Sequence, residues 1–470
     1  MMFDWVAEKL VLFNKKAAGR RPPGPDGLPL FGSLLQARRK PLHFAQNLIQ
    51  KYGDIVHFKI GFFTGYLLNH PEYVKQVLSL NHQNYNKQNY NYQKLKPVLG
   101  EGLITGDGET WAMHRRLIQP IFHRSRLASF GEITTKTTKQ MLEEWALRVN
   151  SGQPVDIAAD MMRLTLEVVT ESLFSADIRS SIDLVRNAFT TLNEDIAYRF
   201  RTAFVPPLWV PTRRNRAFIK ARDELDQLVF DIVERRRENG ESKDDLLERL
   251  LEAGEGLPVE HELTDRQIRD EVITLLLAGH ETTANLLTWT LHLLSQHPGV
   301  AQKLRDELAK VLQGREPSVD DLSELQYMEM VLKESVRLYP PVWIISRKAI
   351  DNDMIDGYTI PAGSTVTLCI YTLHRHPEFW DDPEAFIPER FSGEQSQNRD
   401  KYAYLPFGGG PRSCIGKYFA LMEAQLVLAM ICRQYHLKPV DNHVVEPEPL
   451  VTLRPLNGLK MVFRPVDDNN

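Results

Sequence analysis

The segment Phe407–Gly416, "FGGGPRSCIG", constrains this chain more than any other. Its three consecutive glycines allow positive φ angles and a close approach of the backbone to a bulky flat group. Cys414 immediately precedes a helical pattern, where the helix dipole favours a thiolate. Arg412 supplies a forked cation for a carboxylate, and Phe407 supplies an apolar wall. Together these residue types suit haem iron that is held by one axial cysteine.

Three other uses of this loop fit the residues less well. A phosphate-binding loop would place its first glycine at Pro411 and a Ser or Thr where Tyr418 stands. A zinc site would need a second cysteine or a histidine at short spacing, and the segment has none. A structural core cysteine would explain neither the glycines nor Arg412. The haem-thiolate interpretation accounts for all of these residues.

The composition of the chain excludes several other classes of protein. The chain has 470 residues with ordinary globular content, 43% hydrophobic and 25% charged, and its net charge of −4 argues against a nucleic-acid binder. The three cysteines, Cys369, Cys414 and Cys432, indicate a reducing compartment, so we predict a cytoplasmic location. No stretch reaches the ~20 apolar residues of a transmembrane anchor. Residues 1–13 have one apolar helical face, which packs on the domain or, alternatively, contacts a membrane surface peripherally.

The hydrophobic pattern predicts a mainly α fold with a small β portion. A proline- and glycine-rich stretch, Gly19–Ser33, separates the N-terminal helix from the rest, so we assign residues 1–33 to that helix and segment and 34–470 to one large domain. Strand patterns occur in "DIVHFKI" and "GYLLN", which predict a hairpin, and again after residue 347. The tail, "VTLRPLNGLKMVFRP", predicts a final hairpin around Asn457-Gly458.

A long helix is predicted from Thr264 to just before Pro298. Thr264 and Gln267 form a capping box, and the helix would be roughly 50 Å long. Its apolar centre is interrupted by "AGHETT", where a helix-interior glycine costs about 1 kcal/mol and buried polar groups need partners. Such an interruption indicates a functional site. A zinc-protease helix is excluded because Ala284 stands where a second histidine would be needed.

Both motifs resemble those of the cytochrome P450 family. The cysteine loop matches its Phe-x-x-Gly-x-Arg-x-Cys-x-Gly signature at Phe407, Gly410, Arg412, Cys414 and Gly416. The resemblance implies a single large domain with a long central helix over haem b, and Cys414 as the axial thiolate and iron ligand.

The "AGHETT" segment resembles the family's oxygen-binding helix motif. By that resemblance, Ala278 and Gly279 make room over the iron. Thr282 and Glu281 are the implied catalytic residues: Thr282 would hydrogen-bond dioxygen, and Glu281 would help to relay protons from solvent. His280 receives no role, and we expect it to face the surface.

Two further sets of residues match family motifs. Trp111 and Arg115 in "WAMHRR", together with Arg347 and Arg412, are the implied contacts of the haem propionates, because arginine pairs with carboxylates in bidentate fashion. A network of Glu334, Arg337 and Arg390 is implied to lock the loop that carries Cys414.

The resemblance implies a monooxygenase that uses O2 and a lipophilic small molecule, such as a fatty acid, terpenoid or steroid. Because the chain ends soon after Cys414, we expect electrons from a separate ferredoxin- or flavodoxin-type protein with its reductase. A basic patch would suit such an acidic partner; its candidates are Arg115, Arg116, Arg124, Arg126, Arg412 and Lys417. Lys87 and Lys94 are candidates for recognising a substrate carboxylate.

Two alternatives remain open from the sequence. A peroxide-driven or isomerising haem-thiolate enzyme would often lack an acid–threonine pair, whereas Glu281 and Thr282 are both present. A non-catalytic haem sensor or carrier would need neither proton-relay groups nor a reductase. Oxygenated product in the presence of a surrogate reductase would distinguish the monooxygenase from both.

Overall fold

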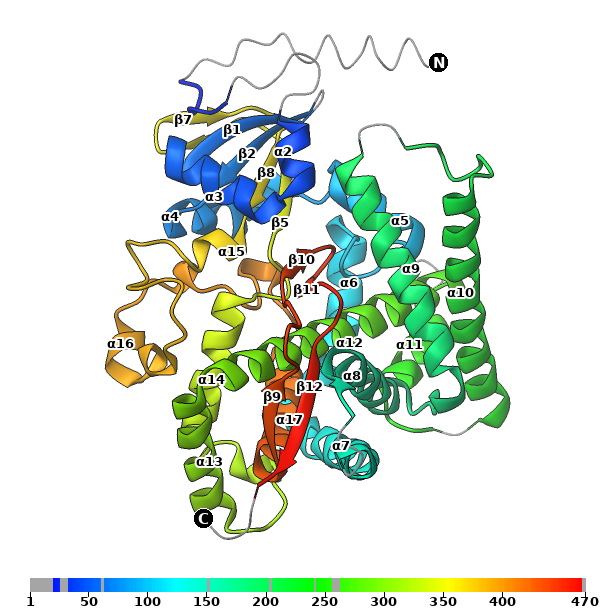
Figure 1. The fold of residues 1–470 in the computed structure, drawn as a ribbon. Coiled ribbons are helices and arrows are strands. Elements are labelled where there is room, and N and C mark those ends of the chain that lie inside the picture. The colour runs from blue at the N-terminus through cyan, green and yellow to red at the C-terminus, as the bar shows by residue number, and fades with distance from the viewer. Residues whose placement is uncertain are drawn as a thin grey trace.

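The computed structural model describes residues 20–25, 33–60, 63–149, 153–202, 205–240, 242–255 and 263–466. Figure 1 shows a mainly helical body with a small sheet at one end, as the hydrophobic pattern predicts. The N-terminal helix of residues 1–13 lies outside the described residues. Residues 20–25 run along the sheet, where the backbone N–H of His57 donates to Pro23 O at 2.9 Å.

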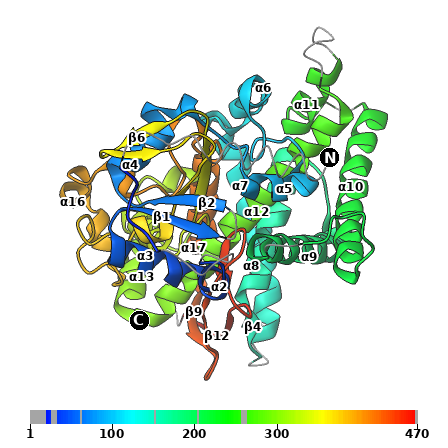
Figure 2. The same cartoon turned by 90° about the horizontal axis from the view of Figure 1, so that it is seen from above.

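The longer helices form the body of the molecule. They are α3 Pro41–Tyr52, α5 Tyr90–Leu99, α6 Gly108–Ile118, α7 Leu127–Val149, α8 Ile157–Phe174, α9 Ile182–Arg201, α10 Arg213–Asn239, α11 Leu246–Glu255, α12 Asp265–Gln296, α13 Pro298–Leu312, α14 Gln326–Leu338 and α17 Lys417–Gln434. The short ones are α2 Leu34–Arg39, α4 Pro71–Lys75, α15 Ile370–Leu373 and α16 Gly393–Gln397. Seen from above in Figure 2, α10 and α11 lie on the side of the body away from β1 and β2.

The strands form one larger and several small sheets. They are β1 Ile55–Ile60, β2 Phe63–Leu68, β3 Tyr85–Asn86, β4 Val155–Asp156, β5 Ile345–Ala349, β6 Asp353–Ile355, β7 Tyr358–Ile360, β8 Thr365–Leu368, β9 Tyr435–Pro439, β10 Pro447–Pro449, β11 Leu453–Pro455 and β12 Lys460–Pro465. The larger sheet has the order β1-β2-β8-β5-β3, in which only β2 and β8 pair in parallel. The predicted hairpin of β1 and β2 is confirmed.

The central helix α12 organises the body. It packs against α8, α10, α14 and α17, and Figure 1 shows it running through the middle of the molecule. Its capping box is present: the Thr264 side chain accepts from the N–H of Gln267, and the Gln267 side chain accepts from the N–H of Thr264. The main apolar core lies around this helix and includes the fully buried Leu287 and Leu291.

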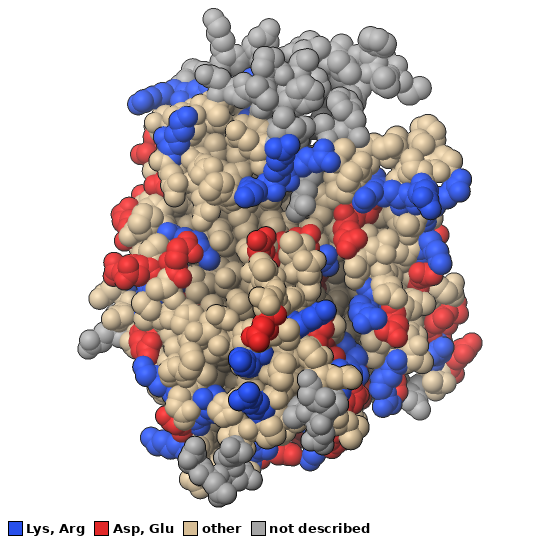
Figure 3. All heavy atoms as spheres, in the orientation of Figure 1, with Lys and Arg blue, Asp and Glu red and all other residues tan. Residues whose placement is uncertain are grey.

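The surface carries charges of both signs. Figure 3 shows acidic and basic side chains interspersed over the face in view, as expected from 57 Lys+Arg against 61 Asp+Glu. Among the described helices, none combines the length and the hydropathy that crossing a bilayer requires.

Two expectations about local structure were wrong. The tail does not form a hairpin around Asn457-Gly458: β11 pairs with β10, whereas β12 pairs with β9 and β4. The turn itself forms, with φ of 65° at Asn457 and 73° at Gly458, but it directs the two strands into different sheets.

The second wrong expectation concerns His280, which is 5% exposed and does not face the surface. Its Nδ1 lies 2.6 Å from Leu276 O, and its ring lies 5.0 Å from that of Phe189 on α9. Burial lowers the pKa of His280 to about 4. The imidazole is therefore neutral in the folded protein at neutral pH.

We expect His280 to make the folded protein acid-sensitive. As the pH falls below the usual histidine pKa of about 6.5, His280 of the unfolded chain binds a proton. In the folded chain His280 stays neutral until the pH reaches about 4. The free energy of unfolding therefore falls as the pH drops through this window, by on the order of 3 kcal/mol at most for this one group.

Thermal melts of the wild type and His280→Leu between pH 4 and 7.5 test this. The variant should lose less stability on acidification, whereas His43→Leu, at an exposed histidine, should follow the wild type. Parallel pH profiles for His280→Leu and the wild type would contradict the prediction.

Candidate haem-thiolate site

The cysteine loop is closed by its own backbone just before α17. The N–H of Cys414 donates to Phe407 O at 2.9 Å, and the N–H of Ser413 donates to Gly410 O at 3.1 Å. Gly408 and Gly410 have φ of 67° and 68°, a conformation that glycine adopts without strain. The glycines thus serve a tight loop that presents Cys414 three residues before Lys417, the first residue of α17.

Gly410 is required for a second reason. A Cβ at this position would lie 1.7 Å from the backbone oxygen of Leu78. A small shift of the backbone could not relieve so close a contact. The loop is therefore packed directly against the backbone at Leu78, which fixes its position in the fold.

The Cys414 side chain is exposed, although protein surrounds it closely enough that burial raises the pKa of its thiol. The N–H of Gly416, Arg115 and Lys417 act in the opposite direction and favour the thiolate. Both observations fit a sulfur that faces an internal hollow with donors and cations behind it. Coordination to a metal ion would deprotonate such a thiol outright.

Four cationic side chains gather on one side of this loop: Lys87, Arg115, Arg347 and Arg412. Trp111 lies between two of them, with the guanidinium of Arg412 4.0 Å and that of Arg115 5.6 Å from its ring. Arg115 also donates to Ser413 O at 2.9 Å, and Arg347 donates to the hydroxyl of Tyr92 at 3.2 Å. The structure therefore brings together all the residues that were predicted to contact propionates.

This cation cluster is short of negative charge. The pKa of Arg412 is lowered to about 10, mainly by burial; Asp107 acts to raise it, and Arg347 and Arg115 act to lower it. Burial also lowers the pKa of Lys87 well below its usual value, and the same arginines add to this effect. Asp107 is the acid in contact with Arg412, so the cluster would be stabilised by an anionic ligand. The two propionates of haem have the charge and the shape that it needs.

Lys87 is the residue of this cluster that sequence reasoning assigned differently. Its Nζ donates to Ile104 O at 2.6 Å and Leu103 O at 3.4 Å, and the side chain is 7% exposed. The sequence "NKQNYNY" marked it as polar and unusual, but only the fold places it beside three arginines. Lys94 lies apart from this cluster, with its Nζ 4.8 Å from the Tyr90 ring.

The middle of α12 differs from the rest of the helix. Ala278 and Thr282, one turn apart, are only partly buried, whereas nearly all other residues between Ile268 and Leu294 are buried. The hydroxyl of Thr282 donates to Ala278 O at 2.7 Å. Small, partly accessible residues within a buried helix fit a flat group lying against it.

Gly279 has a packing reason to be glycine. A Cβ there would lie 2.6 Å from Cγ2 of Val169, so the missing side chain lets α8 and α12 approach closely. Room over an iron atom is therefore not needed to explain this glycine, and the assignment of Ala278 and Gly279 to the space over the iron stays a prediction.

Glu281 is turned away from solvent and is 3% exposed. Its Oε1 accepts hydrogen bonds from Asn193 of α9 at 2.5 Å and from the Thr452 hydroxyl at 2.6 Å. Burial raises the pKa of this carboxyl, which the two hydrogen bonds oppose. Neither partner was foreseen, because both are far from residue 281 in the sequence.

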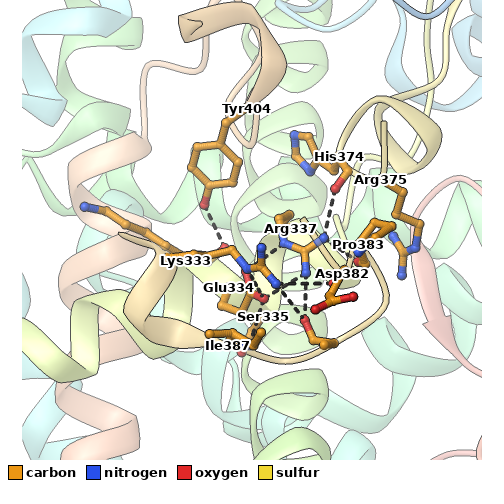
Figure 4. A network of polar contacts seen from close by, with 12 residues as sticks. Lys333, Glu334, Ser335, Arg337, His374, Arg375, Asp382, Pro383, Ile387 and Tyr404 are labelled. Atoms are coloured by element: carbon orange, nitrogen blue, oxygen red, sulfur yellow. Dashed lines mark hydrogen bonds and ion pairs between the residues drawn. The ribbon is translucent and has the colours of Figure 1, made fainter. Parts of the chain in front are cut away.

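The predicted charged network is present and fully buried (Figure 4). Both oxygens of Glu334 accept from Arg337, at 2.7 and 2.8 Å, and Oε1 also accepts from Arg390 at 3.0 Å. Arg337 donates further to His374 O at 3.0 Å. Nε2 of His374 in turn accepts from the N–H of Leu405 at 2.8 Å. The network thus connects α14 to the chain just before Phe407, which fits the expected locking role.

The other two cysteines lie in the core. Cys369 and Cys432 are buried and free, and His374 is fully buried as well. Within the described ranges, no group of three or more His, Cys, Asp or Glu is arranged to hold a metal ion.

The predicted basic patch is reduced by the fold. Arg115 and Arg412 belong to the buried cluster, and Arg126 pairs with Asp244 at 2.5 Å. Arg116, Arg124 and Lys417 remain exposed near the cysteine loop.

A thiol at the end of a glycine loop, a cation cluster with too few acids and small, partly accessible residues in a long buried helix together fit a haem-thiolate protein. The sequence model of the family "Cytochrome P450" matches residues 22–461. The chain belongs to the cytochrome P450 family, and it is a monooxygenase whose cofactor is haem with an axial cysteine thiolate.

Similar proteins cover nearly the whole chain. Cyclooctatin synthase of Streptomyces melanosporofaciens is 35% identical, covering 95% of this chain and 96% of its own length. Cyclooctat-9-en-7-ol 5-monooxygenase of the same organism is 36% identical, covering 88% of this chain and 89% of its own length. The crystal structure of the cytochrome P450DA heme domain matches with a TM-score of 0.85 at 28% identity, covering 96% of this chain and 99% of that one.

Proposed function

We propose that this monooxygenase oxidises a lipophilic, mainly alicyclic substrate of the terpenoid kind, with electrons from a separate redox protein. The cluster of four cations beside Cys414, which Asp107 compensates only in part, is the observation that carries the assignment of the site. The names of the two Streptomyces relatives support a cyclic, largely hydrocarbon substrate. Bound haem would supply the activation of O2.

Within this proposal, Cys414 is the axial ligand, and Arg115, Lys87, Arg347 and Arg412 hold the propionates beside Trp111. Phe407 and Gly410 shape the loop behind the sulfur. Lys87 is added to the predicted set because its ammonium group lies within the same cluster. Two of its N–H groups donate to backbone oxygens and one remains, and because this group lies beside the three arginines we favour a propionate over a substrate carboxylate as its partner.

Thr282 and Glu281 would handle protons in this proposal. The Thr282 hydroxyl lies at the partly accessible turn of α12, and Glu281 is a buried acid at the preceding position of the helix. Pairing an acid with an alcohol in a dry site limits proton delivery to one place.

The exposed Arg116, Arg124 and Lys417 favour an acidic ferredoxin or flavodoxin as the electron donor, since opposite charges speed association. We also propose residues 34–470 as the haem domain, with 1–33 preceding it. The cytoplasmic location and the peripheral membrane contact of residues 1–13 stay predictions.

A substrate-binding screen by difference spectra tests the substrate class. Cyclic terpenoid alcohols should shift the haem spectrum at micromolar concentration and give oxygenated product with a surrogate reductase, and medium-chain fatty acids should do neither. Product from fatty acids alone would overturn the substrate assignment, and spectral shifts without any product would favour a haem sensor.

A further inference from the structure

The carboxyl of Glu281 is held by a hydrogen-bond network from three separate elements. Asn193 lies on α9, Thr452 lies between β10 and β11, and Asn285 lies one turn further along α12. Asn285 donates to the Thr452 hydroxyl at 3.1 Å, so that hydroxyl accepts one bond and donates the other to Glu281. All four side chains are buried, with exposures of 2% to 7%.

The donor and the acceptor of each hydrogen bond in this network can be assigned. The N–H of Val451 donates to Oδ1 of Asn193 at 3.4 Å, which leaves the amide nitrogen of Asn193 to donate to Glu281. Oε1 of Glu281 therefore accepts two hydrogen bonds. In the described part of the chain, no group donates to Oε2.

This asymmetry suits a neutral carboxylic acid. Its carbonyl oxygen accepts hydrogen bonds, and its hydroxyl oxygen has a proton to donate. Burial raises the pKa of Glu281, and the one cation that acts on the group, Arg454, is itself paired with Glu448 at 3.0 Å. A protonated Glu281 with its Oε1 fixed would hold its proton on Oε2.

We propose that Asn193 and Thr452 are positioning residues for Glu281, which fix Oε1 and leave Oε2 as the oxygen that carries and releases the proton. The inference rests on the proposed proton-handling role of Glu281. Asn193 lies on α9, and Thr452 lies in the turn that joins β10 and β11. A movement of α9 or of this turn would therefore change the orientation of the acid.

Infrared difference spectra of the substrate-free holoenzyme give a readout that does not depend on turnover. The carboxylic C=O band of Glu281 is identified by its loss in Glu281→Gln. Thr452→Val and Asn193→Leu should each move this band to higher frequency, because each removes one hydrogen bond from Oε1. Thr452→Ser, which keeps the hydroxyl, should restore the wild-type band.

Thr452→Val and Asn193→Leu should also lower the fraction of reductase electrons recovered in product by roughly fivefold. This factor corresponds to the free energy of one ordinary hydrogen bond. Thr190→Val, at an exposed threonine of α9, is the matched control and should change neither readout. Any variant whose reduced carbon monoxide spectrum differs from the wild type is replaced by Asn193→Asp or Thr452→Ala at the same position.

The outcomes separate the two proposals. An unshifted band in both Thr452→Val and Asn193→Leu would overturn the network, and shifted bands with unchanged coupling would overturn the positioning role. Full coupling in Glu281→Gln would instead overturn the proton role proposed for Glu281 itself.

Discussion

Replacing Cys414 with serine should abolish the red-shifted Soret band of the reduced carbon monoxide complex and reduce oxygenation to the detection limit. The thiol lies beside the N–H of Gly416 and the cations of Arg115 and Lys417, which favour the thiolate. A serine hydroxyl in the same place remains protonated, because its oxygen is far less acidic than sulfur. The spectrum and the product yield with a surrogate reductase measure the effect.

The other two cysteines are matched controls. Cys432 is buried in α17, where burial raises the pKa of its thiol to about 12, and Cys369 is fully buried at the start of α15. Cys432→Ala and Cys369→Ala should keep the red-shifted band. A normal band in Cys414→Ser, or its loss in either control, would show that a different residue ligates the iron.

Removing Glu334 should lower the free energy of unfolding by about 3–5 kcal/mol, the usual cost of leaving a buried ion-pair partner uncompensated. Glu334 and Arg337 are both 0% exposed, and Arg390 shares the same carboxylate. Glu334→Ala would leave two buried guanidinium groups without a counter-charge. Chemical denaturation, or thermal melting where unfolding is irreversible, measures the loss.

An exposed ion pair provides the comparison. Lys139 and Glu316 pair at 2.8 Å with side chains that are 56% and 52% exposed. Glu316→Gln should therefore change stability by less than ~1 kcal/mol. The Glu334→Ala protein should also bind haem poorly, because the network leads through His374 to Leu405 and the cysteine loop. Equal effects of the two substitutions would argue against a locking role.

Local patterns predicted the residues that act within one segment. The loop Phe407–Gly416 could be interpreted because its glycines, its arginine and its cysteine are all needed within ten residues. The helix Asp265–Gln296 was predicted with its capping box because helix signals are local. The prediction of a C-terminal hairpin was wrong for the same reason. Asn457-Gly458 does form a turn, but a turn does not determine with which strands the two flanking strands pair.

The sequence by itself predicted the chemistry of the site, because the proposed thiolate ligand, propionate contacts and acid–alcohol pair each correspond to a short motif. Only the tertiary structure decided that Lys87 joins three arginines and that Asn193 and Thr452 hold Glu281. The reason is physical: charge repulsion and burial are sums over neighbours that lie tens to hundreds of residues apart, and no local pattern records them. For His280 the same rule applied, since helical spacing placed it at the centre of α12 and only packing against Phe189 buried it.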